Sequence, residues 1–257
     1  MSQKNNLPSG FGFYLRRLSS DKDAKALLIR CKEANVSWVS LMVESEDGYI
    51  SKKDILKAYR DVLVAGGIRV WVWTFPGAAR ASSVANSADA ANLAIEYAEH
   101  LNADGIMLDI EKAYKGKKES LNSLVNTTVD KIKDTSLVVG FVSYPIPNFH
   151  KDIEWSCLAK CDFGSPMLYD TAKDKNLIKK SYLQYREHNN IWIPSLATYD
   201  TESAGIEEEQ LRGDLDRVFE GNGDKDIKGA IFWSESTTSV KERRIMADYA
   251  DFLFIGK

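Results

Sequence analysis

The sequence predicts an α/β protein that folds as a single (β/α)8 barrel, and three observations lead to this prediction. Eight short apolar runs alternate along the chain with segments whose apolar residues recur at helical spacing. No composition shift or long linker interrupts the 257 residues. Eight uninterrupted strand–helix pairs are the count for such a barrel, and chains of this length commonly form one as a single domain. We therefore expect one domain over residues 1–257, with residues 1–10 as a flexible tail.

The predicted strands are short, and several are rich in β-branched and aromatic residues. They span 11–15, 37–43, 68–75, 105–110, 137–144, 163–169, 191–197 and 229–233. The predicted helices span 20–34, 51–65, 87–101, 121–132, 155–160, 177–187, 207–219 and 240–254, with Ser20 and Ser51 as N-caps. A doubly wound sheet is the alternative. Such a sheet usually has fewer strands, and it needs a switch-point loop that this sequence does not offer.

Composition excludes several classes of function. The net charge of −3 and the lack of a basic run argue against nucleic-acid binding. No run of about 18 apolar residues is present, so no membrane span is expected. The first ten residues lack the apolar core of a secretory signal, which predicts a cytoplasmic protein, or one carried in a phage particle or released on lysis. Three cysteines are too few for a disulfide framework, and no metal or cofactor motif appears.

The carboxyl ends of the predicted strands carry the candidate functional residues, because active sites of such barrels form at those ends. Aromatic and acidic side chains are concentrated there, which fits a saccharide cleft: rings stack on the apolar faces of sugars, and carboxylates accept hydrogen bonds from hydroxyls. The alternative interpretation is that such residues have only a structural role in the core, and we assign Trp38, Trp71 and Trp192 to the core. The candidates are Glu44, Trp73, Asp109, Glu111, Tyr144, Tyr169, Asp170, Tyr199, Trp233 and Glu235.

The fourth strand is the strongest candidate for the reaction centre. Side chains alternate along a strand, so Met107, Asp109 and Glu111 share one face. The Cα atoms of the two acidic residues should then lie about 6–7 Å apart. Each negative charge disfavours ionisation of the other, and a carboxylic acid with a raised pKa is the group that protonates a glycosidic oxygen. The alternative to a reaction centre is that the strand simply ends here and continues into a charged loop without a catalytic role.

These motifs resemble the family 18 glycoside hydrolases, which include chitinases and endo-N-acetylglucosaminidases. The fourth strand of that family reads D-G-x-D-x-D-x-E, the sixth carries M-x-Y-D, and the eighth ends in a tryptophan. This chain matches at Asp104, Gly105, Asp109, Glu111, Met167, Tyr169, Asp170 and Trp233, and departs where Met107 replaces the first inner aspartate. A second resemblance, over roughly residues 100–240, is to a poorly characterised group of glycoside-hydrolase-like barrel proteins from bacteria and phages.

The family 18 resemblance implies roles for the matching residues. Glu111 would be the general acid, and the N-acetyl oxygen of the substrate would be the nucleophile, one of the exceptions to the two-carboxylate scheme. Asp109 would orient and stabilise the oxazolinium cation, Tyr169 would bind the acetamido oxygen, and Trp233 would pack against the sugar. The thioether of Met107 cannot share a proton, which puts efficient catalysis in question or moves the task of the inner aspartate to another residue.

Three functions remain open from the sequence. The first is a retaining glycosidase that cleaves N-acetylated glycans such as chitin or peptidoglycan. The second is a glycan-binding or virion structural protein on a catalytically weak barrel. The third is a two-carboxylate, muramidase-type glycosidase in which Glu44, Asp170 or Glu235 is the partner of the acid. Each implies a glycan as the ligand, with a possible association with a virion or cell wall.

Overall fold

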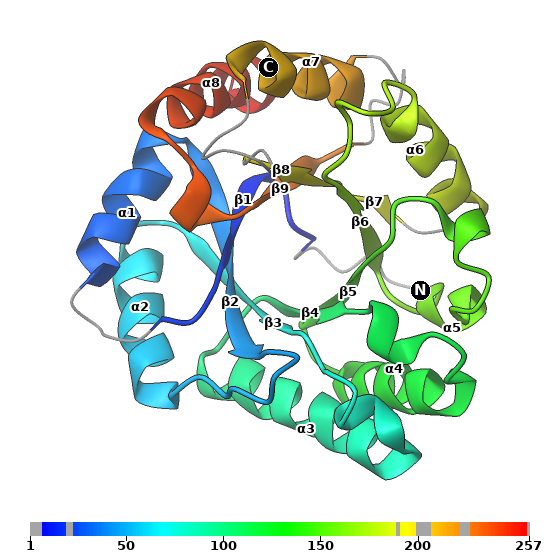
Figure 1. Cartoon of the computed structure of the whole chain (residues 1–257). Coiled ribbons are helices and arrows are strands. Elements are labelled where there is room, and N and C mark those ends of the chain that lie inside the picture. Colours follow the sequence, from blue (N-terminus) through cyan, green and yellow to red (C-terminus); the bar gives the residue numbers. More distant parts are fainter. Residues whose placement is uncertain (1–6, 19–22, 189–190, 199–206, 221–226, 256–257) are drawn as a thin grey trace.

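The computed structural model describes residues 7–18, 23–188, 191–198, 207–220 and 227–255, which form a ring of parallel strands surrounded by helices (Figure 1). The predicted N-cap Ser20 lies outside these residues. The strands are β1 Gly10–Leu15, β2 Val36–Glu44, β3 Arg69–Thr74, β4 Gly105–Asp109, β5 Val138–Ser143, β6 Phe163–Leu168, β7 Ile191–Trp192, β8 Ser195–Ala197 and β9 Gly229–Trp233. The α-helices are α1 Ala24–Glu33, α2 Lys53–Ala65, α3 Val84–His100, α4 Lys118–Ile132, α5 Trp155–Leu158, α6 Leu177–Glu187, α7 Glu208–Phe219 and α8 Val240–Ala250. Shorter turns are η2 Arg80–Ser82, η3 Lys112–Tyr114, η4 Pro147–Phe149, η5 Glu235–Thr237 and η6 Asp251–Ile255.

The parallel pairings close the sheet into a barrel. Strands β1 to β6 pair with their neighbours in chain order, β6 pairs with β8, β8 with β9, and β9 with β1. The short strand β7 pairs with β6 and shares the seventh position of the barrel with β8. The structure therefore confirms the predicted (β/α)8 barrel.

The seventh strand, predicted as one run, is divided into β7 and β8 at Ile193 and Pro194. Proline has no backbone N–H to donate to a neighbouring strand. Pairing continues around the interruption, because the Ile193 amide donates to the Gly164 carbonyl at 3.0 Å and the Ile231 amide donates to the Pro194 carbonyl at 2.9 Å. The interruption thus leaves the barrel closed.

Two separate apolar clusters stabilise the barrel. The larger lies between strands and helices and contains Ile106 and Leu108 of β4. The smaller fills the interior of the barrel, and it contains Met107 of the same strand. Trp38 and Trp71 are fully buried in the interior cluster, and Trp192 is buried in the outer one, as the sequence analysis predicted. Alternation along each strand therefore divides its side chains between two cores.

Glycines in the strands make room for the interior rings. A Cβ atom at Gly105 would overlap the Trp71 ring and the Val138 carbonyl oxygen. A Cβ atom at Gly140 would overlap the Phe163 ring in the same way. The glycine of the D-G motif is thus required by packing, while the preceding Asp104 accepts a hydrogen bond from the Val70 amide at 3.1 Å. Both residues act at the end of the barrel opposite the candidate site.

Part of the predicted flexible tail is ordered. Leu7 packs against the interior cluster, its carbonyl accepts a hydrogen bond from Arg69 at 3.2 Å, and Gly10 already belongs to β1. The predicted capping role of Ser51 is wrong: the N-cap of α2 is Lys52, and the Ser51 hydroxyl donates to the Met42 carbonyl at 2.6 Å. No helix within the described residues combines the length and apolar character that crossing a bilayer requires.

The three cysteines give a first testable prediction. Cys31, Cys157 and Cys161 are buried and free, and burial raises the pKa of Cys31 and Cys157 to about 12 and that of Cys161 further. Because the thiolate is the reactive form, a thiol reagent should react very slowly with the folded protein. A thiol titration of the denatured, unreduced protein should find three free thiols per chain, as should titration of a sample reduced beforehand. Fewer free thiols in the unreduced sample would reveal a disulfide.

Candidate active site

Two carboxyl groups lie together where β4 leaves the barrel. Asp109 is the last residue of β4, and Glu111 directly precedes the η3 turn. The Ile110 amide between them donates to the Val142 carbonyl at 2.8 Å, which carries the β-type pairing past the end of β4. The Ser143 hydroxyl donates to the Ile110 carbonyl at 2.7 Å. This framework fixes the backbone that presents both acids, of which Asp109 is buried and Glu111 half-buried.

The pKa values of both acids are raised above their ordinary values. Burial, followed by the charge of Glu111, raises the pKa of Asp109 well above its ordinary value. Burial also raises the pKa of Glu111, and the charge of Glu46 adds to this effect. The hydrogen bond between the two carboxyl groups raises the pKa of Asp109 and lowers that of Glu111. The other oxygen of Asp109, Oδ1, has no hydrogen-bond partner among the described residues.

Aromatic rings form the floor beside the pair. Trp233, half-buried at the end of β9, lies with its ring centroid 5.6 Å from that of Trp73 and 5.4 Å from that of Tyr14. Trp73 is fully buried beneath it, so Trp73 supports the exposed ring and does not itself face the solvent. The Arg16 guanidinium lies 5.6 Å from the Trp233 ring centroid. A sugar that stacks on that face of Trp233 would have to displace Arg16.

Tyr14 is a site residue that the sequence analysis missed. Its hydroxyl lies 3.0 Å from the Ser195 hydroxyl, which in turn lies 2.8 Å from the Ser165 hydroxyl. Burial raises the pKa of Tyr14, and the nearby charge of Asp109 raises it too. The alternation of β1 could have identified it, because Tyr14 occupies an inward-facing position near the carboxyl end of the strand.

Tyr144, at the end of β5, forms a wall next to Glu111. Burial raises its pKa, and the charge of Glu111 is the next cause. His150 stacks on the Tyr144 ring at a centroid distance of 3.8 Å. The Lys115 ammonium lies 4.7 Å from the same ring centroid and 2.9 Å from the His150 Nδ1 atom. The Tyr144 ring thus packs against His150 and Lys115, and its hydroxyl is near enough to Glu111 to be affected by that charge.

The predicted residues at the sixth and seventh strand ends lie at the rim or outside the described chain. Tyr169 follows β6 at a half-buried position that continues the inward alternation of Ser165 and Met167. Asp170 is exposed and forms an ion pair with Lys173 at 2.8 Å. Tyr199 lies outside the described residues. Of the two that the structure describes, Tyr169 is therefore the one whose position continues the inward alternation.

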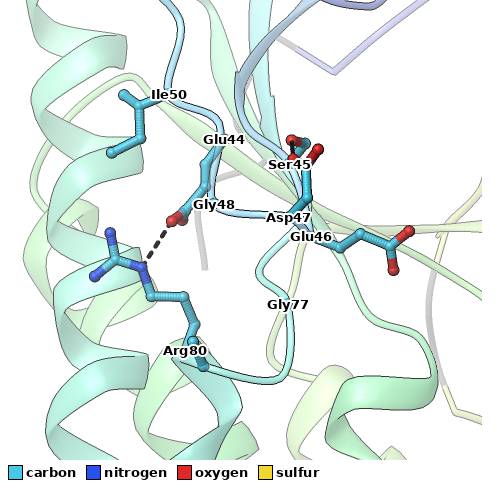
Figure 2. A pocket seen from close by; sticks show the side chains of 9 residues that line it. Glu44, Ser45, Glu46, Asp47, Gly48, Ile50, Gly77 and Arg80 are labelled. Atoms are coloured by element: carbon cyan, nitrogen blue, oxygen red, sulfur yellow. Dashed lines mark hydrogen bonds and ion pairs between the residues drawn. The ribbon is translucent and has the colours of Figure 1, made fainter.

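Two predicted cleft carboxylates are instead paired with arginines. Between Met42 and Glu44 the register against β3 shifts, so that Glu44 pairs with Thr74 on the helix-facing side. There Glu44 accepts a hydrogen bond from Arg80 Nε at 2.7 Å, beside a cavity of about 320 Å³ (Figure 2). Glu235 forms an ion pair with Arg30 of α1. Glu44 does follow the end of the predicted strand, but a one-residue bulge is enough to redirect its side chain.

Glu46 is a third carboxylate of the site that the sequence analysis missed. It is exposed in the loop between β2 and α2, and its charge raises the pKa of both Asp109 and Glu111. The local sequence Ser-Glu-Asp-Gly indicates a turn, but it carries no information on where the glutamate side chain points. Among the described residues, no three His, Cys, Asp or Glu side chains are arranged to hold a metal ion.

Comparisons with known proteins identify solved structures that share this fold. Neither a scan against protein-family models nor a search of curated proteins finds a match. Among solved structures, a GH18 chitinase from Pseudoalteromonas aurantia has a TM-score of 0.72 and 15% identity, covering 94% of this chain and all of that one. A chitinase from Chromobacterium violaceum ATCC 12472 has a TM-score of 0.71 and 11% identity, covering 94% and 99%. The Bacillus cereus spore cortex-lytic enzyme SleL has a TM-score of 0.67 and 11% identity, covering 94% and 74%. At these identities the likeness establishes the fold, and the chain has the (β/α)8 barrel fold of the GH18 chitinases.

Proposed function

We propose that this protein is a retaining glycoside hydrolase of N-acetylated glycans, with Glu111 as the general acid and the acetamido oxygen of the substrate as the nucleophile. The observation that carries the proposal is the buried Asp109–Glu111 pair at the end of β4. Burial and neighbouring negative charges raise the pKa of both acids, which favours the protonated carboxyl group that departure of a glycosidic oxygen requires.

The geometry favours an acetamido nucleophile over a second carboxylate. In two-carboxylate glycosidases the acid and its partner flank the sugar, about 5–5.5 Å apart in retaining enzymes and farther in inverting ones. Here Asp109 and Glu111 share a hydrogen bond, which leaves no room for a sugar between them. Glu44 and Glu235 are paired with arginines, and Asp170 is exposed at the rim. None of the three partners predicted for a muramidase-type mechanism lies free beside Glu111.

The reaction then proceeds in two steps. The proton held by the pair passes to Glu111 through the hydrogen bond that joins the two groups, and Glu111 delivers it to the glycosidic oxygen, which leaves both carboxyl groups ionised. The acetamido oxygen attacks the anomeric carbon as the bond to the leaving group breaks, and the ionised Asp109 stabilises the oxazolinium cation. Water then attacks the anomeric carbon and returns a proton to the pair, so the configuration is retained. Tyr169 binds the acetamido oxygen, and Tyr144 and Trp233 line the sugar site.

Chitin-like glycans and peptidoglycan are the substrates that we propose. Both carry the N-acetyl group that the mechanism uses as a nucleophile. Chitinases and a spore cortex-lytic enzyme are among the proteins that share the fold. If peptidoglycan is the substrate, the protein acts at the cell wall, and delivery by a phage particle or by lysis would bring it there.

The proposed function predicts hydrolysis with retention of configuration. We expect that incubation with N-acetylglucosamine oligomers or peptidoglycan fragments releases products with a new reducing end. Proton NMR at early times should show that the anomer formed first has the same configuration as the cleaved glycosidic bond. A stable analogue of the oxazoline intermediate should inhibit, because it occupies the site as the cation does. Inversion, or hydrolysis that the analogue does not inhibit, would support a two-carboxylate enzyme. Binding without turnover would support a glycan-binding protein.

A further inference from the structure

The cavity beside Glu44 lies between two loops at the carboxyl end of the barrel (Figure 2). The loop after β2 contributes Gly48 and Ile50 to its lining, and the loop after β3 contributes Gly77 and Ala79. Its volume of about 320 Å³ falls in the range of small-molecule sites, about 300–1,000 Å³. No aromatic side chain from the described part of the chain lines it. The cavity is therefore large enough for a small polar molecule, but it offers no ring on which a sugar could stack.

Glu44 places a buried and incompletely bonded carboxylate at this cavity. Its side chain is only 3% exposed, and its Oε1 atom accepts a hydrogen bond from Arg80 Nε at 2.7 Å. Its Oε2 atom is also buried and has no hydrogen-bond partner among the described residues. Buried polar atoms in proteins almost always have a partner, because an unpaired acceptor has lost its contact with water without compensation. Since the terminal torsion of a glutamate is soft, this oxygen can turn to accept a hydrogen bond from a donor in the cavity.

Arg80 adds hydrogen-bond donors beside that acceptor. It uses Nε for Glu44, and its two Nη atoms have no hydrogen-bond partner within the described ranges of the chain. Its side chain lines the cavity and is 26% exposed, so the guanidinium is within reach of a ligand. The Ser87 hydroxyl donates to the Arg80 carbonyl at 3.0 Å, which holds the backbone that carries the guanidinium. The cavity thus presents a carboxylate and a guanidinium side by side.

These two charges select the ligand. An anion without a positive charge would be repelled by Glu44, and a cation without a negative charge would be repelled by Arg80. A molecule that carries an ammonium group and a carboxylate on one carbon meets both, through hydrogen bonds in which each partner is charged. An α-amino acid has this arrangement, and the apolar surface of Ile50 and Ala79 can accommodate its carbon chain.

The cavity lies close to the Asp109–Glu111 pair but on another side of the strands. Thr74 of β3 pairs with Glu44 on one side and with Leu108 of β4 on the other. Neighbouring strands are about 4.8 Å apart, so the backbones of Glu44 and Leu108 are roughly 10 Å apart. Because Glu44 faces the helices, the cavity is separate from the sugar site and suits a branch of a bound glycan.

We propose that this cavity binds the zwitterionic end of an amino acid, with the ammonium group on Glu44 and the carboxylate on the Nη atoms of Arg80. Two sources carry this chemistry. One is a free amino acid. The other is the stem peptide of peptidoglycan, in which a diamino acid can end in an ammonium group and a carboxylate on one carbon. The stem peptide as a source rests on the proposed function, whereas binding of a free amino acid does not.

The first experiment titrates the full-length protein with alanine and follows the amide NMR signals of Gly48 and Gly77. Alanine should shift both signals with saturation. N-acetylalanine lacks the ammonium group and alaninamide lacks the carboxylate, so each should bind about 10–100-fold more weakly. Equal binding of either analogue, or no saturable shift with alanine, would overturn the proposal. Shifts of these signals by N-acetylglucosamine alone would make the cavity a sugar site and would overturn it too.

Two variants assign the contacts. Glu44→Gln can keep the hydrogen bond to Arg80 through its amide oxygen, but it places an N–H donor where the ammonium group would bind. Arg80→Lys keeps the positive charge and loses the paired Nη donors. Each should weaken alanine binding about 10–100-fold. The matched control is Glu99→Gln, at an exposed residue of the last turn of α3, which should bind as the wild type does. If Glu44→Gln does not fold, Arg80→Lys decides, and wild-type affinity in either folded variant refutes the assignment.

A stem tripeptide that ends in diaminopimelate separates the two sources. Tighter binding of the tripeptide than of alanine would assign the cavity to a branch of the substrate, and tighter binding of alanine would assign it to a free amino acid; both support a zwitterion site. Saturable binding in a protein that cleaves no glycan would support the site while refuting the proposed function. Hydrolysis by a protein that binds none of these probes would do the reverse.

Discussion

Replacing Glu111 with glutamine should lower glycan hydrolysis by about 10²–10⁴, the usual cost of losing a general acid. The amide is nearly isosteric with the carboxyl group, but it cannot release a proton to the glycosidic oxygen. It can still form a hydrogen bond with Asp109, so the fold and the shape of the cleft should be kept. Initial rates on N-acetylglucosamine oligomers and peptidoglycan fragments, compared between variant and wild type, measure the loss.

Two further measurements make the result specific to Glu111. Calorimetric titration with an oligosaccharide should give an affinity close to that of the wild type, because binding does not need the proton. Glu99→Gln, the same substitution at the opposite end of the barrel, should leave the rate unchanged. If Glu111→Gln hydrolyses a wild-type substrate as fast as the wild type does, another residue is the acid and the assignment fails.

Asp109→Asn should weaken catalysis and at the same time stabilise the fold at neutral pH. The folded-state pKa of Asp109 lies well above the ordinary value of 3.8, so the folded state binds its proton more tightly than the unfolded state does. Stability therefore falls as pH rises from the unfolded pKa to the folded pKa, by about 1.4 kcal/mol for each unit between them, and stays low above it. Asparagine carries no such charge, so the variant should lose this part of the pH dependence.

Urea unfolding of both proteins at several pH values tests this expectation. The free energies of unfolding should be closest near pH 4 and should diverge in favour of Asp109→Asn as pH rises. A variant that is less stable than the wild type at neutral pH would mean that the ionised carboxylate is satisfied in the fold, which contradicts the coupled pair. The rate of hydrolysis should fall as well, because the asparagine side chain cannot ionise and so provides no negative charge to stabilise the oxazolinium cation.

The architecture could be predicted from the sequence because it depends on patterns that repeat. Eight apolar runs and the helical spacing between them identify the strand–helix pairs, and alternation along β4 separates Met107 and Asp109 from Ile106 and Leu108. The division of the seventh strand follows from Pro194, whose missing N–H is a property of the residue itself. The capping role given to Ser51 failed because its hydroxyl found a partner in β2, a contact that no local pattern contains.

The site was predicted only where it lies on regular strands. Asp109 and Glu111 lie close together because β-type pairing continues past the end of β4. The position of Trp233 could be predicted because it is the last residue of β9. Glu44 turns aside at a one-residue bulge and pairs with Arg80, and Glu235 pairs with Arg30 of α1, contacts that no local pattern contains; their predicted roles stay predictions. The place of Glu46 could not be predicted, since it lies in a turn whose backbone is held by contacts with Gly77 and Arg17, which are distant in sequence.

The Trp71 and Phe163 rings, which pack over Gly105 and Gly140 in the barrel interior, limit the substitutions that the chain can accept during evolution. At Gly140 any larger side chain must be accompanied by a smaller ring on the neighbouring strand, and at Gly105 the Val138 carbonyl would have to move as well, so acceptable changes there are coupled and arise slowly. Loops at the surface vary more freely than such packed positions. A lineage with this barrel can therefore change the rim, where the candidate site lies, while the packed interior remains almost unaltered.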